Sequence, residues 1–230
     1  MSVVKTNVAS MFKNNELQDE VLHGHSLSLE GDTATTFYGY KGILKKEDIS
    51  FDNYEPTHIV ISNFADVREN SNIKSKILIT LVKGSYLKIT KFSESINIIL
   101  ADGRVGYIDP RFIKELGIKD KNLIITNALS YLEVPYRWGG KTPLGVDCSG
   151  LVFMAYFLAG FVIYRDAQLK PPIVSIDPLE MQPTDLIFFE GHVAIYIGNS
   201  NIIHASAENG LVKIESLKRK DILKIGRYIF

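Results

Sequence analysis

The chain has 230 residues but only one cysteine, so no disulfide can form within it. Its stability must come from the burial of apolar side chains, and its thiol is available for chemistry. Neither sign of charge dominates, because 26 Lys and Arg balance 26 Asp and Glu, and we expect no affinity for nucleic acid or an anionic membrane. Long hydrophobic runs are also missing: the longest candidate, residues 151–163, is too short to span a bilayer and indicates a core helix.

The first ten residues lack a basic stretch followed by a continuous apolar segment, which is the pattern of an export signal. We therefore expect a cytoplasmic protein. A chain trimmed of its leader would look the same, so an extracellular or cell-wall location stays open. The length permits one large domain or two to three small ones.

The first half of the chain contains a weak internal repeat. A strand, a glycine turn, an alternating strand and a closing strand after a second glycine turn occur in residues 8–44 and again in residues 67–108, with Val8 laid on Val67. The turn-forming residues 50–57 connect the two copies. We predict two small β-barrels, at residues 1–50 and 57–116, each of marginal size for independent stability.

The pattern changes from strand to helix near residues 117–120. Asp120 is expected to cap a helix whose apolar face includes Leu123, Ile124, Ala128, Leu129 and Leu132. A second, almost wholly apolar helix begins at Asp147 or Cys148 and ends at Gly160, and strands follow at 185–189, 192–197, 201–206, 210–214 and 225–230. This order predicts an α+β domain over residues 120–230.

Cys148 stands at the start of the second helix, after a glycine-rich loop and between Asp147 and Ser149. A thiol attacks as its thiolate, and the partial positive charge at a helix N-terminus favours that ionisation. A lone cysteine is most often a small buried apolar residue, but core cysteines rarely have such polar neighbours. Cys148 is therefore a candidate nucleophile.

His192 and His204 lie in two neighbouring strands of one expected hairpin. If the loop has an odd number of residues, the two rings share a face and lie within reach of each other; if the number is even, they do not. One cysteine and two histidines could also supply three metal ligands. No fourth follows at ordinary zinc spacing, so we expect no metal or cofactor.

Several motifs in order resemble the NlpC family of bacterial cell-wall cysteine peptidases over residues 120–230: PYRWGG (135–140), DCSGLV (147–152), DLIFF (185–189), GHVAIYIG (191–198) and IHA (203–205). The N-terminal repeats resemble bacterial SH3-like domains, without the usual tryptophan in each closing strand. The resemblance implies a papain-like peptidase domain, with a central helix packed on an antiparallel sheet, preceded by two SH3-like barrels.

The subgroup with this arrangement cleaves the bond from γ-D-glutamate to a diamino acid, diaminopimelate or lysine, in murein peptides with a free N-terminal L-Ala. The resemblance implies Cys148 as nucleophile, His192 as general base and His204 as the residue that orients His192. The roles agree with the chemistry of these side chains, since a neutral His204 can accept a hydrogen bond from His192 and fix its tautomer. The Cys148 backbone N–H and the Tyr136 hydroxyl are candidates for the oxyanion hole.

For substrate binding, the resemblance assigns the free ammonium group of the peptide to Asp147. Asp166 is a second acidic candidate, Ser149 could bind the α-carboxylate of D-Glu, and Tyr40 of the first barrel could contact the peptide terminus. The structural alternatives are a helix cap for Asp147 and a loop turn for Asp166. His25 stands where relatives tend to carry an acidic residue.

Two other functions stay open at this stage. An N-acetylmuramoyl-L-alanine amidase or an acyltransferase could use the same fold, because a fold does not determine the substrate. A non-catalytic cell-wall binding protein could carry a degenerate third domain. The sequence predicts a murein peptide as substrate and gives no indication of a protein partner.

Overall fold

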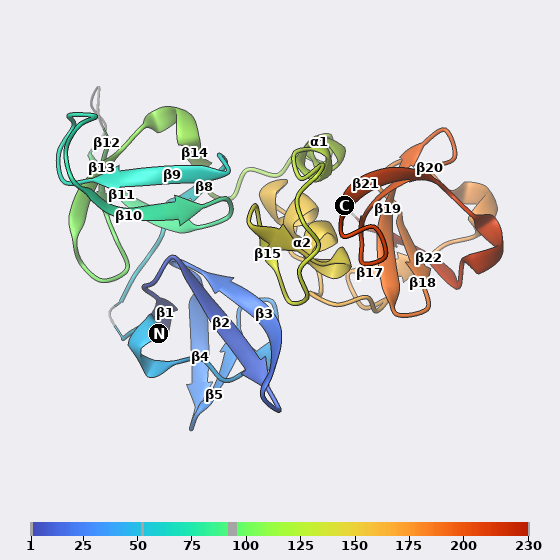
Figure 1. Ribbon diagram of the computed structural model, residues 1–230, viewed down its shortest axis with the longest axis horizontal. Helices are drawn as coiled ribbons and strands as arrows, with labels where there is room; N and C mark the ends of the chain where they lie inside the picture. Colours follow the sequence, from blue (N-terminus) through green and yellow to red (C-terminus); the bar gives the residue numbers. More distant parts are fainter. Residues whose placement is uncertain (1, 52, 92–95, 230) are drawn as a thin grey trace. The chain divides into compact units, whose positions relative to one another are not determined.

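The computed structural model describes residues 2–51, 53–91 and 96–229, and the chain divides into two compact units, Met1–Ile118 and Lys119–Phe230 (Figure 1). Within the described residues, none of the helices has the length and apolar character needed to cross a bilayer. Each unit has its own sheets and buried core.

In its described residues, the first unit is built from strands and two short 3₁₀ helices. Its first part contains β1 (Ser2–Val4), β2 (Val8–Lys13), β3 (Glu16–Leu22), β4 (Ser26–Glu30), β5 (Thr33–Thr36), β6 (Lys41–Gly42), η1 (Lys46–Asp48) and β7 (Ile49–Ser50). Its second part contains β8 (His58–Val60), β9 (Phe64–Arg68), β10 (Ile77–Val82), β11 (Tyr86–Lys91), β12 (Ile96–Ile99), β13 (Val105–Ile108), η2 (Pro110–Phe112) and β14 (Ile113–Glu115).

The two parts have the same strand topology. The first sheet runs β7-β1-β4-β5-β6, and the second contains the equivalent series β14-β8-β11-β12-β13 before it continues into β9 and β10. In the first part β2 pairs with β3 and meets β6 through the bridge between Phe12 and Ile43; in the second, β9 meets β13 through the pair Arg68 and Tyr107. The internal repeat expected from the sequence is confirmed.

Glycines show how the two copies correspond. Gly24 and Gly84 occupy the same turn at positive φ (77° and 91°), a conformation that favours glycine. A Cβ on Gly42 would collide with Met11, and one on Gly106 would collide with Val67, so Met11 is the equivalent of Val67. Laying Val8 on Val67 was therefore wrong by three residues, because strand alternation alone does not fix the offset.

Hydrogen bonds join the two copies inside the first unit. The backbone N–H of Tyr86 donates to the His23 carbonyl oxygen (2.8 Å), and the buried His25 ring bonds through Nε2 to the Gly84 carbonyl oxygen (2.9 Å). The strands of the two sheets lie within residues 2–50 and 58–115. Their division into two separate SH3-like domains stays a prediction.

The second unit packs two helices and a small hairpin with an antiparallel sheet. Its elements are α1 (Leu123–Leu129), β15 (Lys141–Thr142), β16 (Gly145–Val146), α2 (Cys148–Leu158), β17 (Ile173–Ser175), η3 (Pro178–Glu180), β18 (Leu186–Phe189), β19 (His192–Gly198), β20 (Asn201–Ser206), β21 (Leu211–Ser216), η4 (Arg219–Asp221) and β22 (Lys224–Tyr228). The sheet order is β17-β22-β18-β19-β20-β21. Every residue of α2 is buried, and the helix lies against α1, β19 and β20, as an apolar central helix should (Figure 1).

The predicted first helix is shorter than expected. Its N-cap is Asn122, and the Asp120 carboxylate, two residues earlier, accepts a hydrogen bond from the Asn122 N–H (2.9 Å). The helix ends at Leu129, and Leu132 is exposed. The prediction from the apolar pattern therefore placed the end of the helix, and of its buried face, beyond Leu129, where the helix ends.

A β-bulge sets the faces of the two histidines. The turn between β19 and β20 has two residues, Asn199 and Ser200, both at positive φ, and on its own this even loop would place His192 and His204 on opposite faces. The register shifts at Ile197, however, so that Tyr196 pairs with Ile202 across five residues. The odd alternative is confirmed, and both rings lie on one face.

Candidate active site

Cys148 is the first residue of α2, and Asp147 is its N-cap. The Asp147 carboxylate accepts a hydrogen bond from the Gly150 N–H (2.7 Å), which satisfies a donor that the helix cannot. The glycine-rich approach is required here because a Cβ on Gly150 would collide with the Gly140 carbonyl oxygen. The cap and this close packing fix the position of the thiol.

The Cys148 side chain is 7 % exposed, but its surroundings are polar. The backbone N–H groups of Val193 and Ser149 donate toward the sulfur, which places it beside the first residues of β19. Burial and the neighbouring Asp147 carboxylate raise the pKa of the thiol, while the two N–H donors and Arg165 oppose that rise. The lowered pKa expected from the helix N-terminus is thus outweighed by burial, and the resting thiol is protonated.

Asp147, the residue before Cys148, forms a buried ion pair with Arg165. Arg165 is 2 % exposed, and its Nη1 lies 3.0 Å from Oδ1 of Asp147. The same guanidinium donates to the Ser149 hydroxyl (2.7 Å) and to the Gly140 carbonyl oxygen (3.0 Å). The other Asp147 oxygen accepts from the Gly139 N–H (2.8 Å). All these bonds hold the glycine-rich loop against the start of α2.

This network bears on two of the predicted substrate-binding residues. The Asp147 carboxylate has five donors around it, from Gly139, Ser149, Gly150 and Arg165. A substrate ammonium would have to displace one of them, so the geometry favours the helix-cap alternative for Asp147. Ser149 is likewise buried and engaged by Arg165.

A row of hydrogen-bonded side chains lies on one face of β19, β20 and β21. His192 Nε2 lies 2.8 Å from His204 Nδ1, and His204 Nε2 lies 2.9 Å from Oε2 of Glu215. The second oxygen of Glu215 meets the Lys213 ammonium at 2.6 Å. The structure thus confirms that the two histidines are in contact and adds a carboxylate behind them.

The pKa values of this row favour neutral imidazoles. Burial lowers the pKa of His192 to about 4; His204 adds to this effect and Glu215 opposes it. Burial also lowers the pKa of His204. Hydrogen bonds and charge from Lys213 and His204 hold the pKa of Glu215 below its usual value, against the effect of its burial. At neutral pH the row is a carboxylate followed by two uncharged rings.

These charges fix both tautomers. An ionised Glu215 can only accept, so His204 carries its proton on Nε2 and presents a lone pair at Nδ1. That lone pair accepts from Nε2–H of His192, which leaves the His192 lone pair on Nδ1. The nitrogen left with a lone pair is the one not bound to His204, as a general base requires.

Tyr136 lies close enough to Cys148 to interact with its charge. Burial, Cys148 and Asp147 raise the pKa of Tyr136 to about 12, while Arg165 opposes the rise. Its hydroxyl therefore stays protonated at neutral pH and can donate a hydrogen bond. The backbone of Tyr136 is anchored by its N–H, which donates to the Gly210 carbonyl oxygen (2.7 Å).

The remaining predicted residues take no part in the two networks described so far. Asp166 is half-buried and accepts from the Ala167 N–H (2.8 Å), as in the loop-turn alternative. It lines a small pocket with Tyr164 and Val193, one residue from His192. Tyr40 packs on the apolar core of the first unit, and His25 is buried there.

The sequence analysis missed Arg165, Glu215 and Lys213. Arg165 directly follows the apolar and aromatic residues 161–164 after α2, a signal for a paired buried cation. Lys213 and Glu215 alternate along a strand whose register sets Lys213 opposite His204. The alternation was visible in the sequence, but the register was not.

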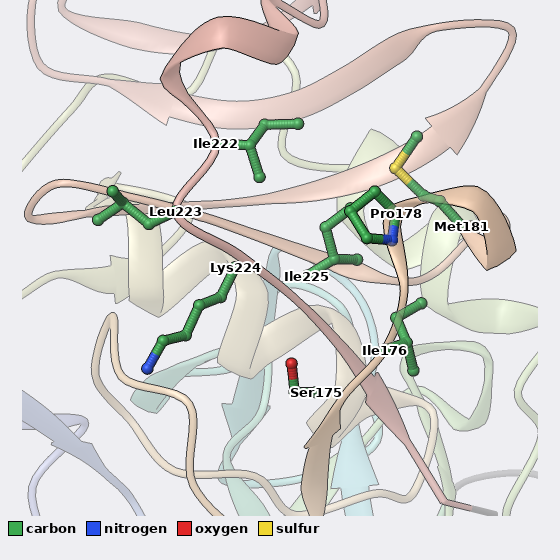
Figure 2. A pocket seen from close by; sticks show the side chains of 8 residues that line it. All are labelled: Ser175, Ile176, Pro178, Met181, Ile222, Leu223, Lys224 and Ile225. Carbon is green, nitrogen blue, oxygen red and sulfur yellow. The ribbon is translucent and has the colours of Figure 1, made fainter.

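Two pockets of about 340 Å³ lie beside the sheet of the second unit, so size does not distinguish them. Figure 2 shows the first, where Ile222, Ile225 and Met181 lie around the hollow and Lys224 is the one titratable lining residue. The second is bordered by His192 and His204. Only the second adjoins an acid–base pair.

Comparisons with known proteins identify the family and the relatives of this chain. The profile of the NlpC/P60 family matches residues 133–225. The chain is 38 % identical over 231 residues to "Dipeptidyl-peptidase 6" of Lysinibacillus sphaericus, covering 88 % of this chain and 84 % of that protein. It is 26 % identical over 197 residues to "Gamma-D-glutamyl-L-lysine dipeptidyl-peptidase" of Bacillus cereus, covering 76 % of this chain and 59 % of that protein.

A solved structure shares the whole fold. The crystal structure of an NlpC/P60 family protein from Bacillus cereus superposes with a TM-score of 0.86 and covers 100 % of this chain and 99 % of that chain. At 20 % identity the likeness concerns the fold alone.

Proposed function

The chain belongs to the NlpC/P60 family, and from this premise we propose that it hydrolyses the γ-D-glutamyl to L-diamino acid bond in murein peptides with a free N-terminal L-Ala. That it is a cysteine peptidase acting on peptidoglycan follows from its relatives. The finer assignment is supported by the names of two relatives, a dipeptidyl-peptidase and a γ-D-glutamyl-L-lysine dipeptidyl-peptidase.

The observation that carries the catalytic assignment is the hydrogen-bonded row that begins at His192, one residue before the Val193 N–H that donates toward the thiol. His192 has its lone pair on Nδ1, and Cys148 lies against the N–H of the next residue, Val193. Because the thiol has a raised pKa and the imidazole a lowered one, both groups are neutral at rest. Proton transfer from sulfur to Nδ1 therefore accompanies the attack.

In the first half of the proposed reaction, Sγ of Cys148 bonds to the γ-carbonyl carbon while its proton moves to His192. The Tyr136 hydroxyl and the Cys148 N–H donate to the oxyanion. The C–N bond then breaks, and the imidazolium gives its proton to the leaving amine. The diamino acid departs, and a thioester between Cys148 and the D-glutamyl group remains.

In the second half, His192 removes a proton from water, and the resulting hydroxide attacks the thioester. The C–S bond breaks, the sulfur regains a proton from His192, and L-Ala-D-Glu leaves as a dipeptide. His204 positions His192 throughout. Glu215 stabilises the imidazolium through His204 without contacting the substrate.

For recognition of the substrate ammonium, Asp166 is the acidic candidate that fits better. Its carboxylate is half-buried, whereas that of Asp147 is occupied by the loop and Arg165. The Ser149 hydroxyl accepts from Arg165 and donates to Asp147, so a contact with the D-Glu carboxylate would require it to exchange a partner. The contact expected of Tyr40 with the peptide terminus stays a prediction. Asp147 contributes indirectly by fixing the loop before Cys148.

The test uses the full chain with L-Ala-γ-D-Glu-L-Lys and its diaminopimelate counterpart, with mass spectrometry of the products. We expect free diamino acid and L-Ala-D-Glu, loss of both with Cys148→Ala, and slower cleavage of the N-acetylated peptide. No product with the wild type, or equal product with Cys148→Ala, would overturn the proposal. Release of sugar from an intact muropeptide would favour an amidase.

A further inference from the structure

A pocket of about 340 Å³ adjoins the hydrogen-bonded row on its solvent side. It shares three residues with the row, namely His192, His204 and Glu215. The volume lies near the lower end of the roughly 300–1,000 Å³ usual for small-molecule sites. Nothing in the catalytic steps described above uses the remaining walls of this pocket.

The reaction requires the leaving residue to lie beside His192. The amine that departs takes its proton from Nδ1 of His192, since Nε2 is bonded to His204. A proton donor and its acceptor must approach to about 3 Å for this transfer. The amino acid attached to that amine therefore lies within one residue length of the His192 ring, and this pocket begins at that ring.

The other walls of the pocket are complementary to a diamino acid. Phe189 and Ile202 provide an apolar surface for a stem of methylene groups. Lys218 and Asp221, both exposed, provide one cation and one carboxylate at the η4 end. A diamino acid in the leaving position has a group to match each wall: an α-carboxylate for the cation, methylenes for the apolar surface and a distal ammonium for the carboxylate.

Glu215 does not serve as the ammonium ligand. One of its oxygens accepts from His204 and the other lies 2.6 Å from the Lys213 ammonium. A second cation would compete with Lys213 for an oxygen already in an ion pair. Asp221 is then the carboxylate of the pocket that can receive a distal ammonium.

We propose that this pocket binds the diamino acid that the reaction releases, with its α-carboxylate at Lys218, its distal ammonium at Asp221 and its methylenes on Phe189 and Ile202. The assignment rests on the proposed function, and it identifies where the residue on the leaving side of the scissile bond binds. The pocket makes Lys218 and Asp221 specificity-determining residues.

The experiment compares three peptides that differ in the leaving residue: L-Ala-γ-D-Glu followed by L-lysine, L-norleucine or L-lysinamide. Norleucine lacks the distal ammonium, and lysinamide lacks the carboxylate. For exposed charge pairs we expect the wild type to prefer lysine by about fivefold in kcat/KM over each analogue. The preference should appear mainly in KM, because the contacts are equally present before and during bond cleavage.

Two variants separate the contacts. Asp221→Asn should bring the lysine-to-norleucine ratio of kcat/KM close to one and leave the lysine-to-lysinamide ratio in place. Lys218→Gln should do the reverse. Matched charge changes at exposed positions of the same unit that do not line the pocket, Lys121→Gln and Glu180→Gln, should alter neither ratio.

Ratios that stay at their wild-type values in Asp221→Asn and Lys218→Gln would overturn the pocket assignment. So would a wild type that cleaves all three peptides with equal kcat/KM, although the proposed function would then stand. If the wild type cleaves none of the three peptides, the proposed function itself fails. Because each variant is read as a ratio between substrates, partial misfolding of a variant does not imitate the expected result.

Discussion

The second unit contains two polar clusters that differ in burial and in pattern of bonding. In the Asp147–Arg165 ion pair the two side chains are 8 % and 2 % exposed; several donors converge on the carboxylate, and the guanidinium donates to several acceptors. In the row of His192, His204 and Glu215, one hydrogen bond joins each group to the next, and Glu215 is 37 % exposed.

This difference separates two tasks of an active site. A buried ion pair with converging hydrogen bonds has one stable arrangement, so it holds the loop and the thiol in place. A linear row of neutral rings can accept a proton at one end while the carboxylate at the other end stabilises the charge. Changes in the first cluster should therefore affect folding, and changes in the second should affect the proton-transfer steps.

The largest expected effect comes from breaking the row at its reactive end. His192→Ala removes the proposed base, and general-base catalysis contributes roughly 10²–10⁴-fold, so we expect kcat/KM to fall by about 10³-fold or more. Far-UV circular dichroism should show that the fold is retained. A variant that keeps most of its kcat/KM would remove His192 from the mechanism.

The second largest expected effect is a loss of stability when the buried ion pair is broken. Arg165→Leu leaves the Asp147 carboxylate buried without its cation, and such a change costs about 3–5 kcal/mol in the free energy of unfolding. Urea denaturation followed by circular dichroism measures it. The matched control is Arg111→Leu, whose exposed pair with Asp109 should leave the denaturation midpoint unchanged. Equal midpoints for the two variants would refute the structural role of Arg165.

A smaller effect is expected from the far end of the row. Glu215→Gln replaces a charge-assisted hydrogen bond, and we expect kcat/KM to fall by about tenfold. Since Glu215 raises the pKa values of His192 and His204, its loss should also move the acid limb of the pH profile to lower pH. A purely structural defect would not move that limb. Lys213→Gln, which leaves the bond to His204 in place, should lower kcat/KM less.

The smallest expected effect is that of pH on the kcat/KM of the wild type, which should fall only in strongly acidic solution. His192 acts as a base only when neutral, and its pKa of about 4 keeps it neutral above that value. The kcat/KM of the wild type should therefore stay nearly constant from pH 7 to pH 5 and fall as the pH drops through 4. A half-maximal value near pH 6.5, where an ordinary histidine titrates, would show that burial does not control this ring.

The two clusters also differ in how far the sequence predicted them. The capped central helix and the five principal strands of the second unit follow from apolar periodicity, and the structure confirms them within one or two residues. The contact of His192 with His204 depended on the parity of a turn, which the bulge at Ile197 decided. Local composition does not specify such a bulge, because the extra residue is selected by the pairing of the whole sheet.

Arg165 and Glu215 could not be assigned because their partners are distant in sequence. Asp147 and Arg165 are separated by a helix, and Glu215 reaches His204 across a strand pair whose register was unknown. For the same reason the repeat in the first unit was recognised but laid three residues out of position. Strand β17 was missed because Pro171 and Pro172 directly precede it, and such residues usually mark a loop.

The most direct test of the proposed chemistry is the position of the protons on the two catalytic rings. Nitrogen-15 NMR of the resting protein labelled in histidine, at pH 7, distinguishes the protonated from the unprotonated nitrogen of each ring. We predict that His192 and His204 both carry their proton on Nε2, with Nδ1 of His192 unprotonated. A proton on Nδ1 of His192 would leave no base for the Cys148 thiol and would contradict the mechanism.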